Sequence, residues 1–156
     1  MFQEESLNPN DAIIYEIVTR HLNRSIKKYD YPWRECPEQN PETRTERMLS
    51  KFAEDYEFCH FRELIEMADW FMVDRNMLYP DVRDKVLAVL FDKRKLDLKI
   101  VISILAWGGL QAVRSIPRTK NGETAMIIRD FVVIMLEEIG LVHWVHENGG
   151  WVIHSI

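Results

Sequence analysis

The stretch LKIVISILAWGGLQAV, residues Leu98 to Val113, decides the fold. Between Lys99 and Gln111 it has no charge and one hydroxyl, that of Ser103, and its apolar side chains point in every direction of a helical wheel. A helix that is apolar all round is surrounded either by protein or by lipid. The uncharged run is much shorter than the roughly 20 residues that cross a bilayer. We therefore predict a buried central helix, with a membrane span as the alternative.

A second strongly apolar helix follows this stretch. Ile116-Pro117 and Asn121-Gly122 predict a turn, and Glu123 opens the next helix. Apolar residues then recur at helical spacing at Met126, Ile127, Phe131, Ile134, Met135 and Leu136. The central helix is therefore expected to sit in an apolar helical hairpin.

Amphipathic helices are predicted on both sides of this hairpin. Asn8-Pro9 supplies a cap and a proline at the first helical position, and Thr43 with Glu46 has the form of a capping box. The other helical patterns cover Phe61–Met72, Tyr79–Leu90 and Leu141–Glu147, the last ended by Asn148-Gly149-Gly150. No stretch alternates apolar and polar residues over a strand's length, so we predict an all-α fold.

Composition narrows the class of protein. A chain of 156 residues, 47% of them apolar, is expected to form one domain over residues 1–156. The net charge of -5 argues against a nucleic-acid partner. Cys36 and Cys59 form neither a disulfide framework nor a zinc-ribbon spacing, although one bridge between them stays open. The acidic amino terminus is unlike a secretory signal, so we expect an intracellular protein.

The segment WVHENGGW, residues Trp144 to Trp151, resembles the second homology segment of the Bcl-2 family of apoptosis regulators. The family pattern is W-[I/V]-x-[D/E]-N-G-G-W. The matching residues are Trp144, Val145, Glu147, Asn148, Gly149, Gly150 and Trp151. A match this short gains its weight from the segments that accompany it.

Three further segments resemble the family in the family's order. Asp97 to Gly109 resembles the first segment, in which N-W-G-R precedes an apolar run and F-G-G; here Trp107, Gly108 and Gly109 take the F-G-G positions. Ile14 to Leu22 resembles the fourth segment, with Glu16 at its acidic position. Leu49 to Glu54 resembles the third, with Ala53 as its small residue. The resemblance implies a Bcl-2-like helical bundle around a central apolar hairpin.

The resemblance also implies a function, which is to capture the amphipathic BH-3 helix of pro-apoptotic family members in an apolar surface groove. A protein of this kind is no enzyme and needs no cofactor. By position in the motifs, the groove residues are Tyr56, His60, Leu64, Met67, Val86 and Leu90, with Asp97, Lys99 and Ile100 at its centre. The plain alternative is that the apolar members of this set are core residues.

The chain departs from the family where the groove arginine is expected. Ile100 stands at that position, and Lys99 replaces the glycine before it. An apolar residue cannot neutralise a ligand carboxylate, and loss of one partner of a buried charge pair costs about 2 to 5 kcal/mol. Lys99 or Arg94 could supply the positive charge without arginine's two-pronged geometry. We therefore expect weakened or narrow ligand selection.

The end of the chain resembles the family's diverged viral homologues. It stops five residues after Trp151, where the family usually continues into a membrane anchor, so no transmembrane anchor is expected in this chain. We expect an anti-apoptotic protein in the cytoplasm of host cells, peripheral to mitochondria. An open apolar groove could also be covered by a second copy, which makes a homodimer an alternative.

Three rival functions remain at this point. An enzyme or metal protein would use His143, His146 and Glu147 with His154, but the H-E-x-x-H spacing of zinc hydrolases is absent, so no metal is expected. A membrane-inserting pro-apoptotic protein would use the apolar hairpin, which Arg129 and Asp130 disfavour. A helical scaffold would have no ligand of its own.

Overall fold

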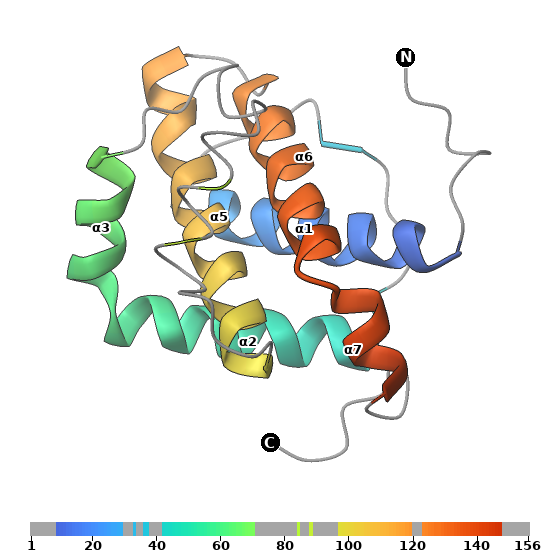
Figure 1. The fold of residues 1–156 in the computed structure, drawn as a ribbon. Helices are drawn as coiled ribbons and strands as arrows, with labels where there is room; N and C mark the ends of the chain where they lie inside the picture. Colours follow the sequence, from blue (N-terminus) through green and yellow to red (C-terminus); the bar gives the residue numbers. More distant parts are fainter. Residues whose placement is uncertain are drawn as a thin grey trace.

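The computed structural model describes residues 9–29, 33, 36–37, 42–70, 84, 88, 97–119 and 123–147. Every regular element within these ranges is an α-helix, so the prediction of an all-α fold is confirmed (Figure 1). The helices are α1 (Pro9–Lys28), α2 (Arg44–Cys59), α3 (Phe61–Trp70), α5 (Leu98–Thr119), α6 (Glu123–Glu138) and α7 (Leu141–Glu147). The helix predicted over Tyr79–Leu90 lies outside the described residues except for Asp84 and Ala88, which are both helical.

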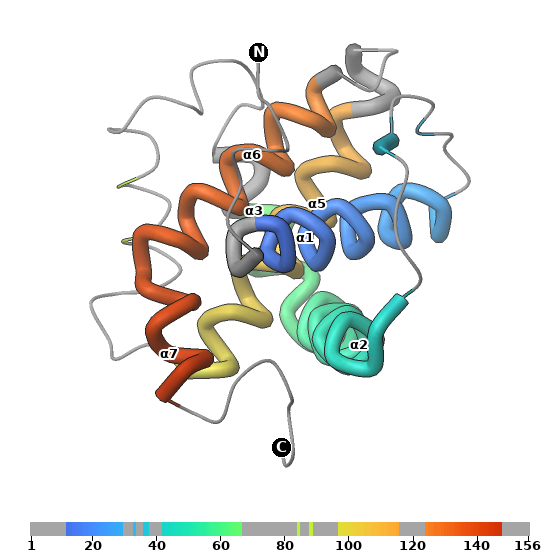
Figure 2. Tube along the Cα trace, turned by 90° about the vertical axis from the view of Figure 1, so that its right-hand side faces the viewer, coloured from blue at the N-terminus to red at the C-terminus, as the bar shows by residue number. Residues whose placement is uncertain are grey.

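Helix α5 is the centre of the bundle, as predicted. Helices α1 and α2 cross it, α3 and α6 lie on either side of it, and all four contact it (Figure 1). In the view turned by 90°, the first part of α5 lies between α7 on one side and α2 on the other (Figure 2). Ile104, Leu105 and Trp107 have less than 1% of their surface exposed. The apolar side chains of α5 therefore face protein in every direction.

The same helix passes a composition test for membrane spans. Among the described helices, α5 is long and apolar enough to cross a bilayer. Its segment Leu98–Ser115, however, is 83% buried inside the protein. Core helices pass this test as readily as spans do. The burial favours the prediction of a core helix.

The carboxyl-terminal end of α5 corrects one prediction. We expected Ile116-Pro117 to form a turn, but the helix continues to Thr119. Proline removes one backbone N–H and disfavours helical geometry in the residue before it. Here the proline lies in the last turn, and the turn before it is held by the buried residues Val113 and Ser115. The cost of the proline is confined to the end of the helix.

The predicted starts of α1 and α2 are confirmed. Helix α1 begins at Pro9 and extends to Lys28, with Ile26 fully buried near its end. Thr43 caps α2: its hydroxyl accepts a hydrogen bond from the Glu46 N–H at 3.1 Å and donates one to the Glu46 carboxylate at 3.0 Å. This exchange satisfies an amide that the first turn of a helix leaves without an intrahelical partner.

The turn between α6 and α7 depends on Gly140, which the sequence interpretation did not single out. Its φ of +85° lies in the left-handed region, which favours glycine. The Gly140 N–H donates to the Glu137 carbonyl at 3.1 Å, and the Gly140 carbonyl accepts from the Trp144 N–H at 2.9 Å. This residue therefore ends α6 and starts α7. The predicted stop at Asn148–Gly150 lies outside the described residues.

Both cysteines are free thiols. Cys36, half-buried in the connection between α1 and α2, donates a weak hydrogen bond to the Pro37 carbonyl at 3.6 Å, and Cys59 is exposed at the end of α2. Trp33, in the same connection as Cys36, is 6% exposed and belongs to the core. The disulfide alternative is therefore wrong.

Candidate functional site

The described part of the predicted groove lies on α2 and α3, which follow one another around His60. His60 caps the end of α2, and its ring stacks on that of Tyr56 with the ring centroids 4.2 Å apart. Both side chains are half-buried. Leu64, one turn into α3, is 2% exposed and belongs to the core. The side chain of Met67 and the whole of Val86 and Leu90 lie outside the described residues, so the groove they were predicted to line stays a prediction.

The first turn of α5 separates the three residues predicted at the groove centre. Asp97 is exposed and caps the helix, because its Oδ1 accepts the Ile100 N–H at 2.9 Å. Lys99 is exposed, whereas Ile100 is 2% exposed and lies in the core. The position that corresponds to the family's arginine therefore points inward. Of the two residues that were expected to carry a compensating charge, Lys99 is described and lies at the surface, and Arg94 lies outside the described residues.

The residues of the W-G-G element shape the packing of α5. Trp107 is fully buried and its ring centroid lies 5.8 Å from that of Phe131 on α6. A Cβ added to Gly108 would lie 2.7 Å from Cγ2 of Val132, and one added to Gly109 would lie 2.6 Å from Oγ of Ser25. These glycines let α6 and α1 approach the α5 backbone closely. The first homology segment therefore acts here through helix packing.

The second homology segment is described only in part. Trp144 is half-buried on α7 and packs against the core, and Val145 is 5% exposed. Asn148, Gly149, Gly150 and Trp151 lie outside the described residues. The packing of α7 therefore explains the apolar positions of this segment, and the predicted roles of its glycines stay predictions.

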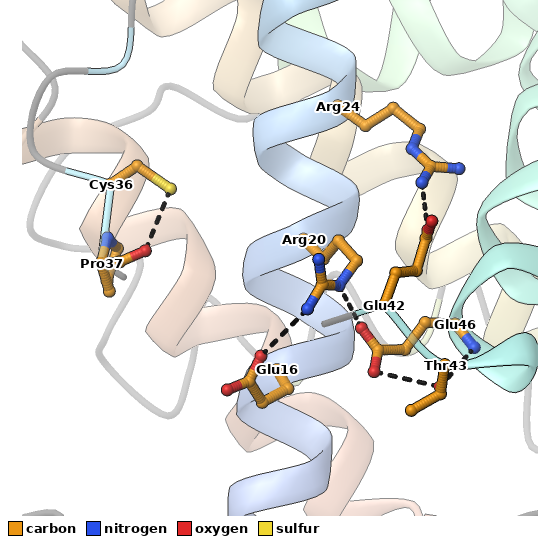
Figure 3. A network of polar contacts seen from close by, with 8 residues as sticks. All are labelled: Glu16, Arg20, Arg24, Cys36, Pro37, Glu42, Thr43 and Glu46. Atoms are coloured by element: carbon orange, nitrogen blue, oxygen red, sulfur yellow. Dashed lines mark hydrogen bonds and ion pairs between the residues drawn. The ribbon is translucent and has the colours of Figure 1, made fainter. Parts of the chain in front are cut away.

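A polar network joins α1 to α2 and was not predicted. Arg20 forms ion pairs with Glu16 on its own helix and with Glu46 on α2, and Arg24 pairs with Glu42 just before α2 (Figure 3). Lys28 reaches Glu57 near the end of α2, with 3.7 Å between its Nζ and a carboxylate oxygen. Because Glu46 is 7% exposed, its pairing with Arg20 offsets the cost of burying a charge.

His21 lies at the inner side of this network. It is 3% exposed on α1, and its Nδ1 lies 3.0 Å from the Ser50 hydroxyl of α2. Burial, and after it the positive charge of Arg24, lower the pKa of His21 from 6.5 to about 4, although a hydrogen bond with the Leu105 backbone acts in the opposite direction. The sequence contained a signal for this residue, because His21 falls on the same helical stripe as Ile14, Val18 and Leu22.

Glu57 shows the opposite effect of burial on an acid. It is 7% exposed, and burial raises the pKa of its carboxyl group, while the amino group of Lys28 lowers it. The α1–α2 contact therefore holds a base and an acid whose pKa values burial shifts in opposite directions, each towards the neutral form.

The metal alternative gains no support from the described residues. None of their histidine, cysteine, aspartate and glutamate side chains form a group of three or more that could hold a metal ion. His143 instead lies 3.0 Å from the Glu147 carboxylate across one turn of α7, and both side chains are exposed. His154 lies outside the described residues.

Comparison with known proteins identifies the fold through solved structures. No protein-family model and no curated protein sequence matches the chain, whereas 86 chains of solved structures do. One of them is the crystal structure of chicken BOK, with a TM-score of 0.69 at 18% sequence identity, over 92% of this chain and 95% of the BOK chain. The buried central helix and the helices packed around it are thus arranged as in that structure. The molecule has the fold of the Bcl-2 family.

Proposed function

We propose that this protein is an anti-apoptotic regulator that captures the BH-3 helix of pro-apoptotic partners in a groove beside α2, α3 and the start of α5. The captured helix would present apolar anchors at one face and a carboxylate near Lys99. The partner would be held away from its own targets. Cell death would be restrained by this sequestration.

The observation that carries the proposal is the agreement of two independent features. The molecule has the Bcl-2 fold, and four sequence segments resemble the family's homology segments in the family's order. Helices α2 and α3 pack against a central helix that is buried from Ile100 to Val113. A fold of this kind supports helix-in-groove binding, although a fold alone does not specify a ligand.

The charge at the start of α5 sets the expected affinity. Ile100 is buried and apolar, so the ligand carboxylate has to be neutralised by another residue. Lys99 is exposed in the same helical turn and is our candidate. Lysine offers a point charge, whereas the planar guanidinium of arginine can donate two hydrogen bonds to one carboxylate. We therefore expect modest affinity and few partners.

Titration calorimetry with a panel of BH-3 peptides tests both claims. We expect binding to a few peptides, and Lys99→Glu should weaken it about 10- to 100-fold, since a like charge would then face the ligand carboxylate. Lys27→Glu is the matched control, because Lys27 is exposed on α1. Absence of binding on the order of tens of micromolar would reject the proposal. Equal affinity of Lys99→Glu and the parent protein would remove Lys99 from this role.

The direction of the activity needs a separate experiment. A similarity of fold is compatible with protection and with killing, and α5 is long and apolar enough to span a bilayer. Expression in cells given a death stimulus should raise survival, and dye-filled liposomes should stay intact. Leakage with lowered survival would favour the membrane-inserting alternative, and no effect in either assay would favour a scaffold.

The setting and assembly of the protein belong to the same proposal. From the strong divergence of the homology segments we further propose kinship with the diverged viral homologues, and action in the cytoplasm of host cells near mitochondria. Phe58 and Phe61 are 87% and 45% exposed at the junction of α2 and α3, which keeps the homodimer alternative open. Light scattering over a range of protein concentrations decides between monomer and dimer.

A further inference from the structure

His21 lies where three helices meet. Its Nδ1 contacts the Ser50 hydroxyl of α2 at 3.0 Å, and its Nε2 faces α5, where a Cβ added to Gly109 would lie 2.9 Å away. The backbone of Leu105, one turn earlier in α5, hydrogen-bonds the ring. A neutral imidazole suits these partners, because one ring nitrogen donates to a carbonyl and the other accepts from a hydroxyl. We call His21, Ser50, Leu105 and Gly109 the His21 junction.

A protonated ring would find no compensating charge at the His21 junction. The charged group of α1 that acts on the ring is Arg24, which is positive. Helix α5 has no ionisable side chain from Ile100 to Val113. On the other packed helices, Glu46 pairs with Arg20, Glu57 with Lys28, and Asp130 with Arg129. Helix α2 also carries the half-buried Glu54, whose negative charge acts on Glu57. A proton on His21 would therefore add an uncompensated charge to the core.

Acid should therefore act on this junction before it acts on the apolar core. His21 has a pKa of about 4 in the folded chain against an ordinary 6.5, so between these values the unfolded or opened chain binds a proton that the folded chain does not. Stability of the junction is complete above pH 6.5 and falls as the pH drops towards 4. Glu57 acts in the opposite sense, because its raised pKa favours the folded chain on acidification.

We propose that the His21 junction is an acid-sensitive latch, in which protonation of the imidazole separates α1 from α2 and α5 while the α5–α6 hairpin stays packed. The charged ring has to reach water, which requires the contact of α1 with α2 and α5 to open. In the hairpin, Trp107 packs against Phe131 and Gly108 against Val132, and these contacts are apolar.

Hydrogen exchange with mass spectrometry at pH 7, 5 and 4 tests the latch, after correction for intrinsic exchange rates. We expect the opening constant of α1 and α2 to rise about a hundredfold between pH 7 and pH 4, and that of α6 to change far less. The variant His21→Gln keeps a neutral hydrogen-bonding side chain and should lose this pH dependence. His143→Gln is the matched control, because His143 is exposed on α7.

Two results would overturn the proposal. One is the same acid response in His21→Gln and the parent protein. The other is a loss of protection in α6 that keeps pace with α1, which would describe general acid unfolding. If His21→Gln does not fold, the imidazole of the parent protein is titrated by NMR. A native spectrum that persists while His21 titrates near pH 6.5 rejects the latch, and a ring that stays neutral until α1 signals shift supports it.

Discussion

The buried polar residues of α5 differ in the free-energy cost of their burial. Ser103 and Ser115 each donate their hydroxyl to a carbonyl of their own helix, at 2.8 Å in both cases. Gln111 is 1% exposed, and neither atom of its side-chain amide has a hydrogen-bond partner within the part of the chain that the structure describes. A buried amide without partners costs about 1 to 3 kcal/mol relative to water.

Replacing Gln111 by methionine should therefore stabilise the protein. Methionine has a similar length and no group that needs a hydrogen bond, so we expect Gln111→Met to raise the free energy of unfolding by about 1 kcal/mol. Urea unfolding followed by circular dichroism measures it. Gln111→Glu is the opposing control and should be strongly destabilising, since it buries a charge. A loss of stability in Gln111→Met would mean that the amide does have a partner.

At the scale of elements, α1 and α5 are joined by close backbone approach. The place of a Cβ on Gly109 is occupied by Ser25 Oγ at 2.6 Å and His21 Nε2 at 2.9 Å. We expect Gly109→Ala to lower the free energy of unfolding by about 1 to 3 kcal/mol, as overpacking does.

A second substitution makes that test specific. Ser25→Ala removes the nearest obstructing atom, so Gly109→Ala with Ser25→Ala should be less destabilised than the sum of the two single variants. The four unfolding free energies form a double-mutant cycle. Additive effects would show that Gly109 and Ser25 do not compete for the same space.

Most helix boundaries could be predicted, because they depend on local chemistry. Pro9 and Thr43 mark the starts of α1 and α2 through backbone rules that need no tertiary information. Pro117 misled the prediction, because its effect depends on how firmly the preceding turn is packed. Gly140 was missed, since a positive φ is a property of the connected helices and not of glycine alone.

At the scale of the whole molecule, the sequence predicted the inside better than the site. Burial of α5 follows from the absence of charged residues between Lys99 and Arg114. The ion pairs between α1 and α2 depend on the angle at which the two helices cross, which no pattern within either helix contains. The inward position of Ile100 and the surface position of Lys99 likewise depend on how α5 is rotated in the bundle.

Substitution of two phenylalanines, one buried and one exposed, tests which positions belong to the core. Phe131 is fully buried against Trp107, and Phe58 is 87% exposed at the end of α2. We expect Phe131→Ala to cost about 3 to 5 kcal/mol and Phe58→Ala about 0.5 kcal/mol or less. Thermal and urea unfolding of both variants provide the comparison. Comparable losses would mean that Phe58 is covered by another surface.

The Ser103 hydroxyl of α5 affects how much the surrounding sequence can change during evolution. Because the Ser103 hydroxyl finds its acceptor within its own helix, neighbouring helices need to offer it only shape and apolar surface. Mutations in those neighbouring helices can then accumulate without leaving a buried hydroxyl unpaired, as long as the total side-chain volume is conserved. A buried hydroxyl that is satisfied within the central helix leaves the residues around it free to change, and this is one physical route by which a fold persists while its sequence diverges.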